Sequence, residues 1–346
     1  MVKSLPDRPC RIAIMTGDHT ATDPTKPGGH YNPEDLQQHQ IMVAAFQSHK
    51  DYDVDVWNEH HPLLDRLRQS PPDLVVNFND TGYLNQAVLE LNLPAYMEML
   101  GVPYTGAPPA AMVICYDKAL VRMAAESLGV AVPREVFIPA NAPLDTLPGF
   151  FPALIKPNTA DGSLGITKDA VVRDAAQAWA YMTWLREALP GRDALYQEYL
   201  PGPEYGIGII GNPQSGLRIL PPLEVDFSKL PKGLNPILSY ESKSLPDSPY
   251  WTDIGFRKAD IAASVKEKML SGVSQLFQRL QLRDYARFDF RVAADGEPKL
   301  MEVNPNPAWE SGGKLAIMSS FDDLTYPDML RLIIDTAWTR VKTSRL

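Results

Sequence analysis

Residues 287–307, RFDFRVAADGEPKLMEVNPNP, decide the fold that the sequence predicts. Polar and apolar residues alternate over 287–292, and alternation returns over 299–303. Asp295-Gly296 between them is typical of a tight turn. The stretch therefore predicts two strands joined as a hairpin.

This predicted hairpin carries a set of oxygen ligands. Every second side chain of a strand faces the same way, so Asp289 shares a face with Arg287, and Glu302 shares a face with Asn304. Two carboxylates and an amide suit Mg²⁺, which prefers hard oxygen ligands. The sequence predicts a magnesium site here; a solvated acidic hairpin is the alternative for the motif taken alone.

A second motif is suited to phosphate. A predicted buried strand ends at Lys156, and a loop of small residues follows over 158–166. Gly162 and Gly165 would let backbone N–H groups approach an anion, and the Ser163 hydroxyl adds a donor. The alternative is a surface hairpin loop with a lysine nearby.

The order of the motifs carries a resemblance to a known family. Lys156 and its loop are followed by the connector EYLPGPE at 198–204, and then by RFDF and EVNPNP at 287–290 and 302–307. The chain resembles an ATP-grasp ligase of the D-alanine:D-alanine ligase branch, with further matches at 102–106 and 117–118. The resemblance covers about residues 70–318.

The resemblance implies ATP and Mg²⁺ as cofactors, with Mn²⁺ as an alternative metal, and it implies a role for each matching position. Asp289, Glu302 and Asn304 match the magnesium ligands. Catalytic roles fall to Arg287, Lys243 and Ser163. The nucleotide-binding positions are Lys118, Lys156, Gly162, Ser163, Leu164, Gly165, Gln197, Glu198, Leu200, Glu204 and Lys243.

The activity implied is that of an ATP-dependent carboxylate-amine ligase, which forms an amide through an acyl phosphate. The alternative is an ATP-binding protein without catalysis that acts as a regulator or scaffold. Retention of Lys243 and Arg287 favours catalysis, because nucleotide binding alone does not need them. A hydroxyl or thiol acceptor in place of the amine stays open.

Departures from the family pattern gather on the substrate side. They lie at 16–20, 77–82 and 308–313 and at Ser244. We therefore expect amino-acid-like substrates other than D-alanine with D-alanine. Glu310, beside Trp309, could hold a substrate ammonium with help from the indole face, or could be an exposed loop glutamate. The candidate substrate residues are Glu310, Ser311, Gly312, Asn79 and His19.

Composition limits the partners. Lys and Arg number 33 against 42 Asp and Glu, a net charge of −9 that argues against nucleic acid. No apolar run reaches the ~18 residues of a membrane helix. Residues 1–10 lack a signal-peptide core, and two distant cysteines give no disulfide framework, so we expect a cytoplasmic protein without membrane partners. The resemblance implies a homodimer.

We predict an α/β (α+β) chain of three lobes: an N-terminal open α/β sheet over 1–113, a central lobe over 114–204 and a C-terminal lobe over 205–346. Parallel strands are expected at 11–15, 52–57 and 74–78. Helices are expected at 34–49, 84–91, 117–128, 169–189, 258–280 and 326–341.

Two features have weaker patterns. Residues 231–255 follow no clean period and contain Lys243, so we predict a lid that nucleotide orders. His60 and His61 are interpreted as surface residues rather than metal ligands, because spaced Cys, Asp or Glu partners are lacking. His19 and His30 lie in the loop after the first strand, where open α/β sheets bind ligands.

Overall fold

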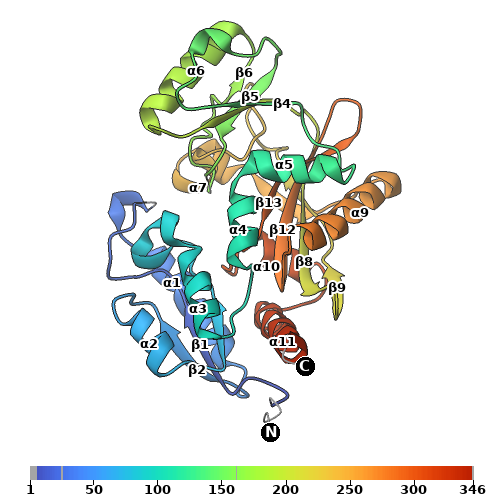
Figure 1. Ribbon diagram of the computed structural model, residues 1–346. Helices are drawn as coiled ribbons and strands as arrows, with labels where there is room; N and C mark the ends of the chain where they lie inside the picture. The colour runs from blue at the N-terminus through green and yellow to red at the C-terminus, as the bar shows by residue number, and fades with distance from the viewer. Residues whose placement is uncertain (1–5, 25, 161, 345–346) are drawn as a thin grey trace.

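The computed structural model describes residues 6–24, 26–160 and 162–344, so Asp161 of the small-residue loop lies outside the described residues. Three sheets follow one another along the chain. The sheet of the first strands lies low in the molecule, the six-stranded sheet beside it, and the four-stranded sheet at the top (Figure 1). The division at residues 113 and 204 stays a proposal.

The first sheet has the parallel strands that the sequence predicts. Its order is β2-β1-β3, and β1 pairs in parallel with both neighbours. One predicted helix is wrong: residues 84–91 form two short 3-10 turns, because Leu84 and Asn85 adopt φ values of 54° and 55° that no α-helix contains. The elements are β1 Arg11–Met15, α1 Pro33–Gln47, β2 Asp53–Trp57, α2 Leu63–Gln69, β3 Leu74–Asn77 and α3 Asn92–Leu100.

The four-stranded sheet is antiparallel, with the order β4-β7-β5-β6. The helix predicted over 169–189 begins later, since Val171–Val172 form β6 and Asp174 caps the helix by accepting from the Gln177 N–H. The helix predicted over 117–128 is confirmed, with Asp117 as its N-cap. The elements are α4 Pro109–Tyr116, α5 Lys118–Ser127, β4 Glu135–Ile138, β5 Ala153–Pro157, β6 Val171–Val172, α6 Ala175–Ala188 and β7 Ala194–Glu198.

The largest sheet has the order β11-β10-β8-β12-β13, and β9 pairs with β8. The helix predicted over 258–280 begins only at Ala263, because Lys258 ends a strand. Residues 231–255 contain two short helices. The elements are β8 Glu204–Asn212, β9 Gly216–Ile219, β10 Leu223–Asp226, α7 Glu241–Ser244, α8 Pro249–Thr252, β11 Gly255–Lys258, α9 Ala263–Arg279, β12 Tyr285–Val292, β13 Pro298–Asn304, α10 Lys314–Ser320 and α11 Tyr326–Ser344.

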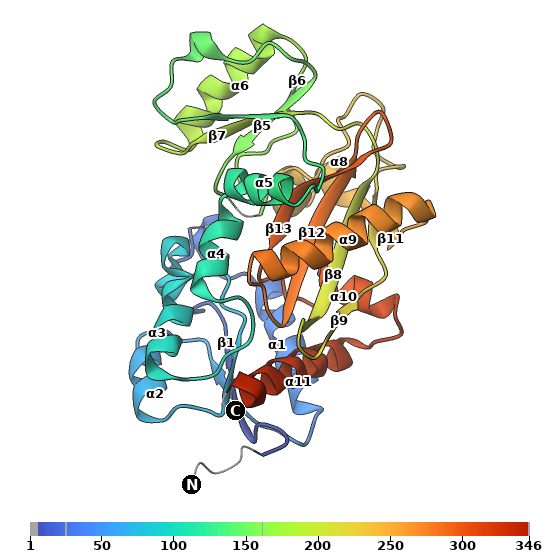
Figure 2. The same ribbon diagram turned by 45° about the vertical axis from the view of Figure 1, so that its right-hand side comes forward.

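The two faces of this sheet differ in character. On β12, Ala286, Phe288 and Phe290 are buried in an apolar cluster shared with α4, α5 and α9, which cover that face (Figure 2). The alternate positions, which include Arg287 and Asp289, face the other way. The covered face supplies apolar burial. On the opposite face, α10 and α11 pack against β8, and the polar side chains of Arg287 and Asp289 lie on that same face.

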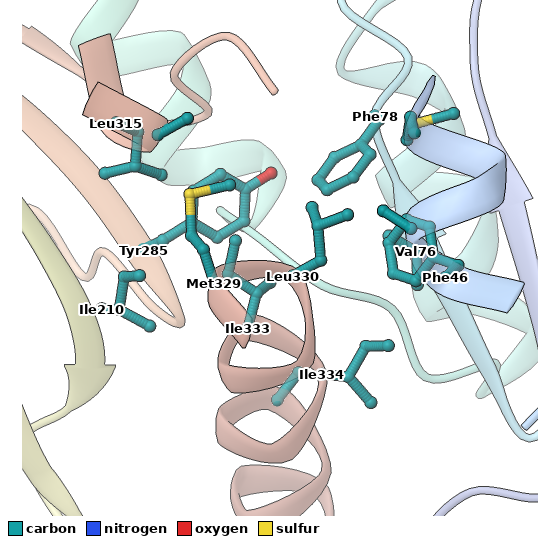
Figure 3. Close-up of a cluster of buried hydrophobic side chains, with 14 of the residues drawn as sticks. Phe46, Val76, Phe78, Ile210, Tyr285, Leu315, Met329, Leu330, Ile333 and Ile334 are labelled. Carbon is teal, nitrogen blue, oxygen red and sulfur yellow. The ribbon is translucent and has the colours of Figure 1, made fainter. Parts of the chain in front are cut away.

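Helix α11 joins the first and the largest sheets. Leu330 and Ile334 lie toward Phe46, Val76 and Phe78, and the other labelled residues of the helix lie toward the largest sheet (Figure 3). Each fully buried apolar side chain of this kind stabilises the fold by about 1.5–3 kcal/mol. Helix α11 therefore holds the carboxyl ends of the strands of the first sheet beside the largest sheet. In the described part of the chain, no helix is long and apolar enough to cross a membrane.

Candidate nucleotide and magnesium site

The predicted hairpin is confirmed, and its register brings the predicted ligands together. Arg287 pairs directly with Asn304, and Asp289 pairs directly with Glu302. The Asn304 side-chain amide lies 3.3 Å from Asp289 Oδ2 and 3.3 Å from Glu302 Oε1. On the neighbouring strand, a Cβ at Gly206 would lie 3.5 Å from Asp289 Oδ1. Glycine therefore leaves space beside the carboxylates.

Both carboxylates are held in the ionised form. Burial favours the neutral acid, but Arg287 and Lys314 outweigh it and lower the pKa of Asp289 to about 2. Arg287 donates to Asp289 from Nε at 2.9 Å and from Nη2 at 3.0 Å. Burial also favours the neutral form of Glu302, but Lys118, Lys156 and Arg287 together outweigh it and lower the pKa of Glu302. Two anionic carboxylates with an amide that can turn its oxygen inward fit Mg²⁺.

Two lysines approach this face from other elements. Lys118, the first residue of α5, donates to the Ala160 carbonyl at 2.7 Å and lies 3.7 Å from Glu302 Oε2. Lys156 is only 3% exposed, and its side-chain amino group makes no hydrogen bond or ion pair among the described residues. Burial lowers the pKa of Lys156. A buried cation without a partner fits a site for phosphate.

The glycine-rich loop has the left-handed backbone that its glycines allow. Gly162, Ser163 and Gly165 have φ values of 62°, 63° and 73°. The Ser163 hydroxyl donates to the Leu238 carbonyl at 2.9 Å, and the Tyr240 N–H donates to the Ile166 carbonyl at 2.7 Å. Leu164 lies at the loop's surface. The loop is thus bonded to the segment that carries Lys243.

Lys243 faces the hairpin from α7. Protein surrounds its amino group although the side chain reaches solvent, and this desolvation, together with the charge of Lys314, lowers the pKa of Lys243 to about 8. Lys314 lies 3.9 Å from Glu204 Oε1 and 3.9 Å from Asp289 Oδ2. Sequence reasoning missed Lys314, although it follows the glycine pair 312–313 directly before a helix.

The predicted adenine edge lies on β7. Gln197 is 2% exposed, and its Nε2 donates to Glu135 Oε2 at 2.6 Å while its Oε1 has no partner among the described residues. Glu198 is occupied instead, because it accepts from the Arg134 N–H at 2.9 Å and pairs with Lys299. Leu200 is buried behind this edge. Gln197 Oε1, a buried acceptor without a donor, is suited to accept a hydrogen bond from the amino group of adenine.

Arg291 is a residue that the sequence analysis missed, and it bonds to three separate segments. Its guanidinium, 4% exposed, lies 3.3 Å from Glu204 Oε2, 2.5 Å from the Pro236 carbonyl and 3.4 Å from the Tyr199 hydroxyl. Arg291 lies opposite Glu204 in the β12–β8 pairing, a contact between residues 87 apart that no local sequence pattern shows. Arg291 therefore orients the predicted ribose carboxylate.

The loop after β1 is held by a histidine that had been interpreted as a surface residue. His60 is fully buried: its Nε2 lies 2.8 Å from the Thr16 carbonyl, and its Nδ1 accepts from the Leu84 N–H at 2.7 Å. Accepting at Nδ1 requires the neutral ring, and burial lowers the pKa of His60 accordingly. Asp18 accepts from the His60 N–H at 2.8 Å. His61 and His30 are exposed.

The candidate substrate residues lie at the junction of this loop with the segment after β13. His19 contacts Asn58 at 3.2 Å, and burial together with His39 lowers its pKa to about 4. Ser311 Oγ donates to Gln38 Oε1 at 3.0 Å, and Gly312 follows it. Trp309 stacks on Phe78 with ring centroids 6.0 Å apart, so one indole face is occupied by protein rather than open to a cation.

The predicted residues thus fall into two groups. The hairpin ligands lie with Arg287, Lys118, Lys156 and Lys243 around one face, as the mutual charge effects show. The substrate candidates Asn79, His19 and Glu310 lie with the loops at the carboxyl ends of β1 and β3. No group of three His, Cys, Asp or Glu side chains that could hold a metal is found in the described residues.

Comparison with known proteins agrees with this arrangement. A family model described as D-ala D-ala ligase C-terminus matches residues 147–335. An uncharacterised protein, y4sG of Sinorhizobium fredii, is 27% identical over 251 residues, which span 72% of this chain and 70% of that protein. A D-alanine–D-alanine ligase of Oleidesulfovibrio alaskensis is 30% identical over 237 residues, 66% of this chain and 70% of the ligase.

The fold is shared with solved structures. The D-alanine–D-alanine ligase of Bacillus anthracis in complex with ATP superposes with a TM-score of 0.71 at 20% identity, over 97% of this chain and 100% of that one. That identity speaks for the fold alone. The family model, which matches more than half of the chain, shows the family: this chain belongs to the D-alanine–D-alanine ligase family and has its ATP-grasp fold.

Proposed function

We propose that this protein is an ATP-dependent ligase that joins a carboxylate to an amine through an acyl phosphate. The observation that carries the proposal is the convergence of Asp289, Glu302 and Asn304 with a surplus of cations. Binding of nucleotide alone does not need a cation such as Arg287 beside the metal ligands. The family relationship supports the same reading.

The balance of charge suits a triphosphate and a carboxylate. Apart from the buried pair of Arg291 with Glu204, five side chains at the site are cationic, and Asp289 and Glu302 are anionic, which leaves a net charge of about +3 before ligands bind. The cations are Lys118, Lys156, Lys243, Arg287 and Lys314. Bringing two anions together is repulsive, so this surplus lowers the free energy of the encounter.

In the reaction, an oxygen of the substrate carboxylate bonds to the γ-phosphorus while the bond from that phosphorus to the β–γ bridging oxygen breaks, which releases ADP. The amine then bonds to the acyl carbon, loses a proton, and phosphate leaves. Arg287 and Lys243 would stabilise the charge on the transferred group, and Lys118 and Lys156 the remaining phosphates. Asp289, Glu302 and Asn304 would hold Mg²⁺, which when bound would neutralise charge on the phosphates.

The nucleotide would lie between the four-stranded sheet and the largest sheet. Gln197 Oε1 offers an acceptor to the adenine amino group, and Glu204, oriented by Arg291, offers a carboxylate to the ribose hydroxyls. Ser163 donates to Leu238, so its part is to hold the loop to the Lys243 segment. We propose that this bonded unit closes over ATP as a lid.

We further propose that the substrates are not D-alanine with D-alanine. The substrate side supports this proposal. Asp18 there already accepts hydrogen bonds from the backbone N–H groups of Thr20, Ala21 and His60, so its carboxylate is not free to bind an amine. Other groups must recognise the substrates.

The test is release of ADP from Mg-ATP across L- and D-amino acids, singly and in pairs, with phosphate measured in parallel. The proposal expects one pair to release ADP above either partner alone, together with an amide product found by mass spectrometry. Asp289→Asn is the blank, and Asp322→Asn, an exposed acid paired with Arg218, is the matched control that should keep activity. ATP binding without ADP release from any pair would count against ligation.

A further inference from the structure

Two loops from different parts of the chain face each other at the substrate end. The loop after β3 carries Phe78 and then Asp80, and the loop after β13 carries Trp309 and then Glu310. Phe78 and Trp309 stack with their rings 13° from parallel and 6.0 Å apart. This stack brings the two acidic residues to the same end of the site, beside the loop after β1.

Neither acid is neutralised by the protein. Asp80 and Glu310 have no ion-pair partner among the described residues, and Asp80 is exposed to solvent. The cation whose charge lowers the pKa of Asp80 is Lys26, which already pairs with Asp35 at 2.7 Å. Dense surrounding protein, then the charge of Glu310, raises the pKa of Asp80 to about 7. The two carboxyl groups therefore have no ion-pair partner among the described residues, and a bound cation would favour the ionised form of Asp80.

A buried donor lies next to this pair. Asn79 is 4% exposed, and its side-chain nitrogen has no partner among the described residues, while its Oδ1 accepts from Thr81 Oγ1 at 3.2 Å. A polar group buried without a partner is costly, and it is commonly satisfied by a ligand where it borders a site. An amide N–H suits a carboxylate or carbonyl oxygen of the same ligand.

Resting on the proposed ligase function, we propose that Asp80 and Glu310 form a subsite for a diamino acid, a substrate with two ammonium groups. Two free carboxylates exceed what a single α-ammonium neutralises, and a second ammonium on the side chain restores the balance. Asn79 donates to an oxygen of the substrate. The subsite lies between the loops after β3 and β13, which the stack of Phe78 on Trp309 brings together.

The test is binding, measured by calorimetry, of ornithine against norleucine in both enantiomers, with Mg²⁺ and ADP present. The two amino acids have the same length and differ by an ammonium in place of a methyl. We expect the protein to prefer ornithine by about tenfold or more, as a charge-assisted hydrogen bond implies. Asp80→Asn and Glu310→Gln should each reduce that preference, and the double variant should abolish it.

Controls separate this inference from the ligase proposal. Glu267→Gln, an exposed acid on α9, should keep the preference, and Asp80→Glu should keep most of it; melting temperatures check that each variant is folded. Equal binding of ornithine and norleucine, or a preference that survives the double variant, overturns the subsite. Binding needs no turnover, so a preference without ADP release in the panel described above would leave the subsite standing and count against ligation.

Discussion

The contacts of Arg291 allow a prediction with a worked magnitude. Arg291→Met keeps the length of the side chain and removes the guanidinium, which ends the contacts to Glu204, Pro236 and Tyr199. Of these contacts, only the one with Glu204 joins two charged groups, so the loss of this buried pair sets the magnitude. Arg291 is 4% exposed, so solvent screening is slight.

We expect Arg291→Met to lower the free energy of unfolding by about 3 kcal/mol. Breaking a buried pair costs about 3–5 kcal/mol, and the lower end applies because Glu204 keeps Lys314 at 3.9 Å. Urea denaturation measures this loss. Arg218→Met is the matched control: its pair with Asp322 is exposed, and its removal should cost about 0–1 kcal/mol.

The same variant tests the orientation of Glu204. If Arg291 positions that carboxylate for the ribose, Arg291→Met should raise the KM for ATP about tenfold. The ratio of the KM for 2′-deoxy-ATP to the KM for ATP should also be smaller in the variant, because its contact to the 2′-hydroxyl is already weakened. A loss of stability below about 1 kcal/mol would refute the energetic reasoning. An unchanged nucleotide ratio would refute the positioning role, whatever the stability.

Three further predictions concern other parts of the molecule. Asp289→Asn should weaken Mg²⁺ binding by at least ~10- to 100-fold, because that loss is typical even for residues that only hydrogen-bond to a metal ligand. Calorimetry with Mg²⁺ and ADP measures the affinity, and an unchanged affinity would contradict the prediction. Burial lowers the pKa of His60 from 6.5, so His60 contributes stability above pH 6.5 that is lost as the pH falls further, because the unfolded chain takes up the proton. The free energy of unfolding, measured by urea denaturation, should drop by up to ~1.4 kcal/mol per pH unit below pH 6.5, and His60→Asn should flatten that slope while lowering stability at pH 7.5. Gly165→Ala should destabilise by about 1–3 kcal/mol, because φ is 73° and the new Cβ would lie 2.6 Å from Pro157 Cγ; Gly191→Ala, also at positive φ but in open space, should cost less, and equal melting temperatures for the two variants would argue against a steric cause.

Local patterns predicted the site where a strand or loop carried the signal itself. The alternation around Asp289 and Glu302 gave the hairpin and its polar face, and the register confirms both. Arg291 and Lys314 were missed, because each acts through partners distant in sequence. His60 was misjudged for the same reason: a histidine pair shows no burial until the loops around Thr16 and Leu84 close over it.

The helix boundaries show how local signals compete. Residues 84–91 have apolar spacing, yet the bond from the Leu84 N–H to His60 holds a left-handed backbone that a helix excludes. The helix expected from 169 starts at Ala175, since Val171–Val172 pair with Ala153 and Leu154 instead. In both cases a tertiary contact outweighs a propensity worth a fraction of a kcal/mol per residue.

The sequence by itself determined the hairpin, the parallel first sheet, the glycine-rich loop and the family resemblance, because alternation, glycine positions and motif order are local properties. Only the tertiary structure decided which charges meet: Lys118 with Glu302, Arg291 with Glu204, and Asp80 beside Glu310. The reason is physical. Coulomb interactions and hydrogen bonds depend on distance in space, and the chain separations between those partners leave no trace in a local pattern.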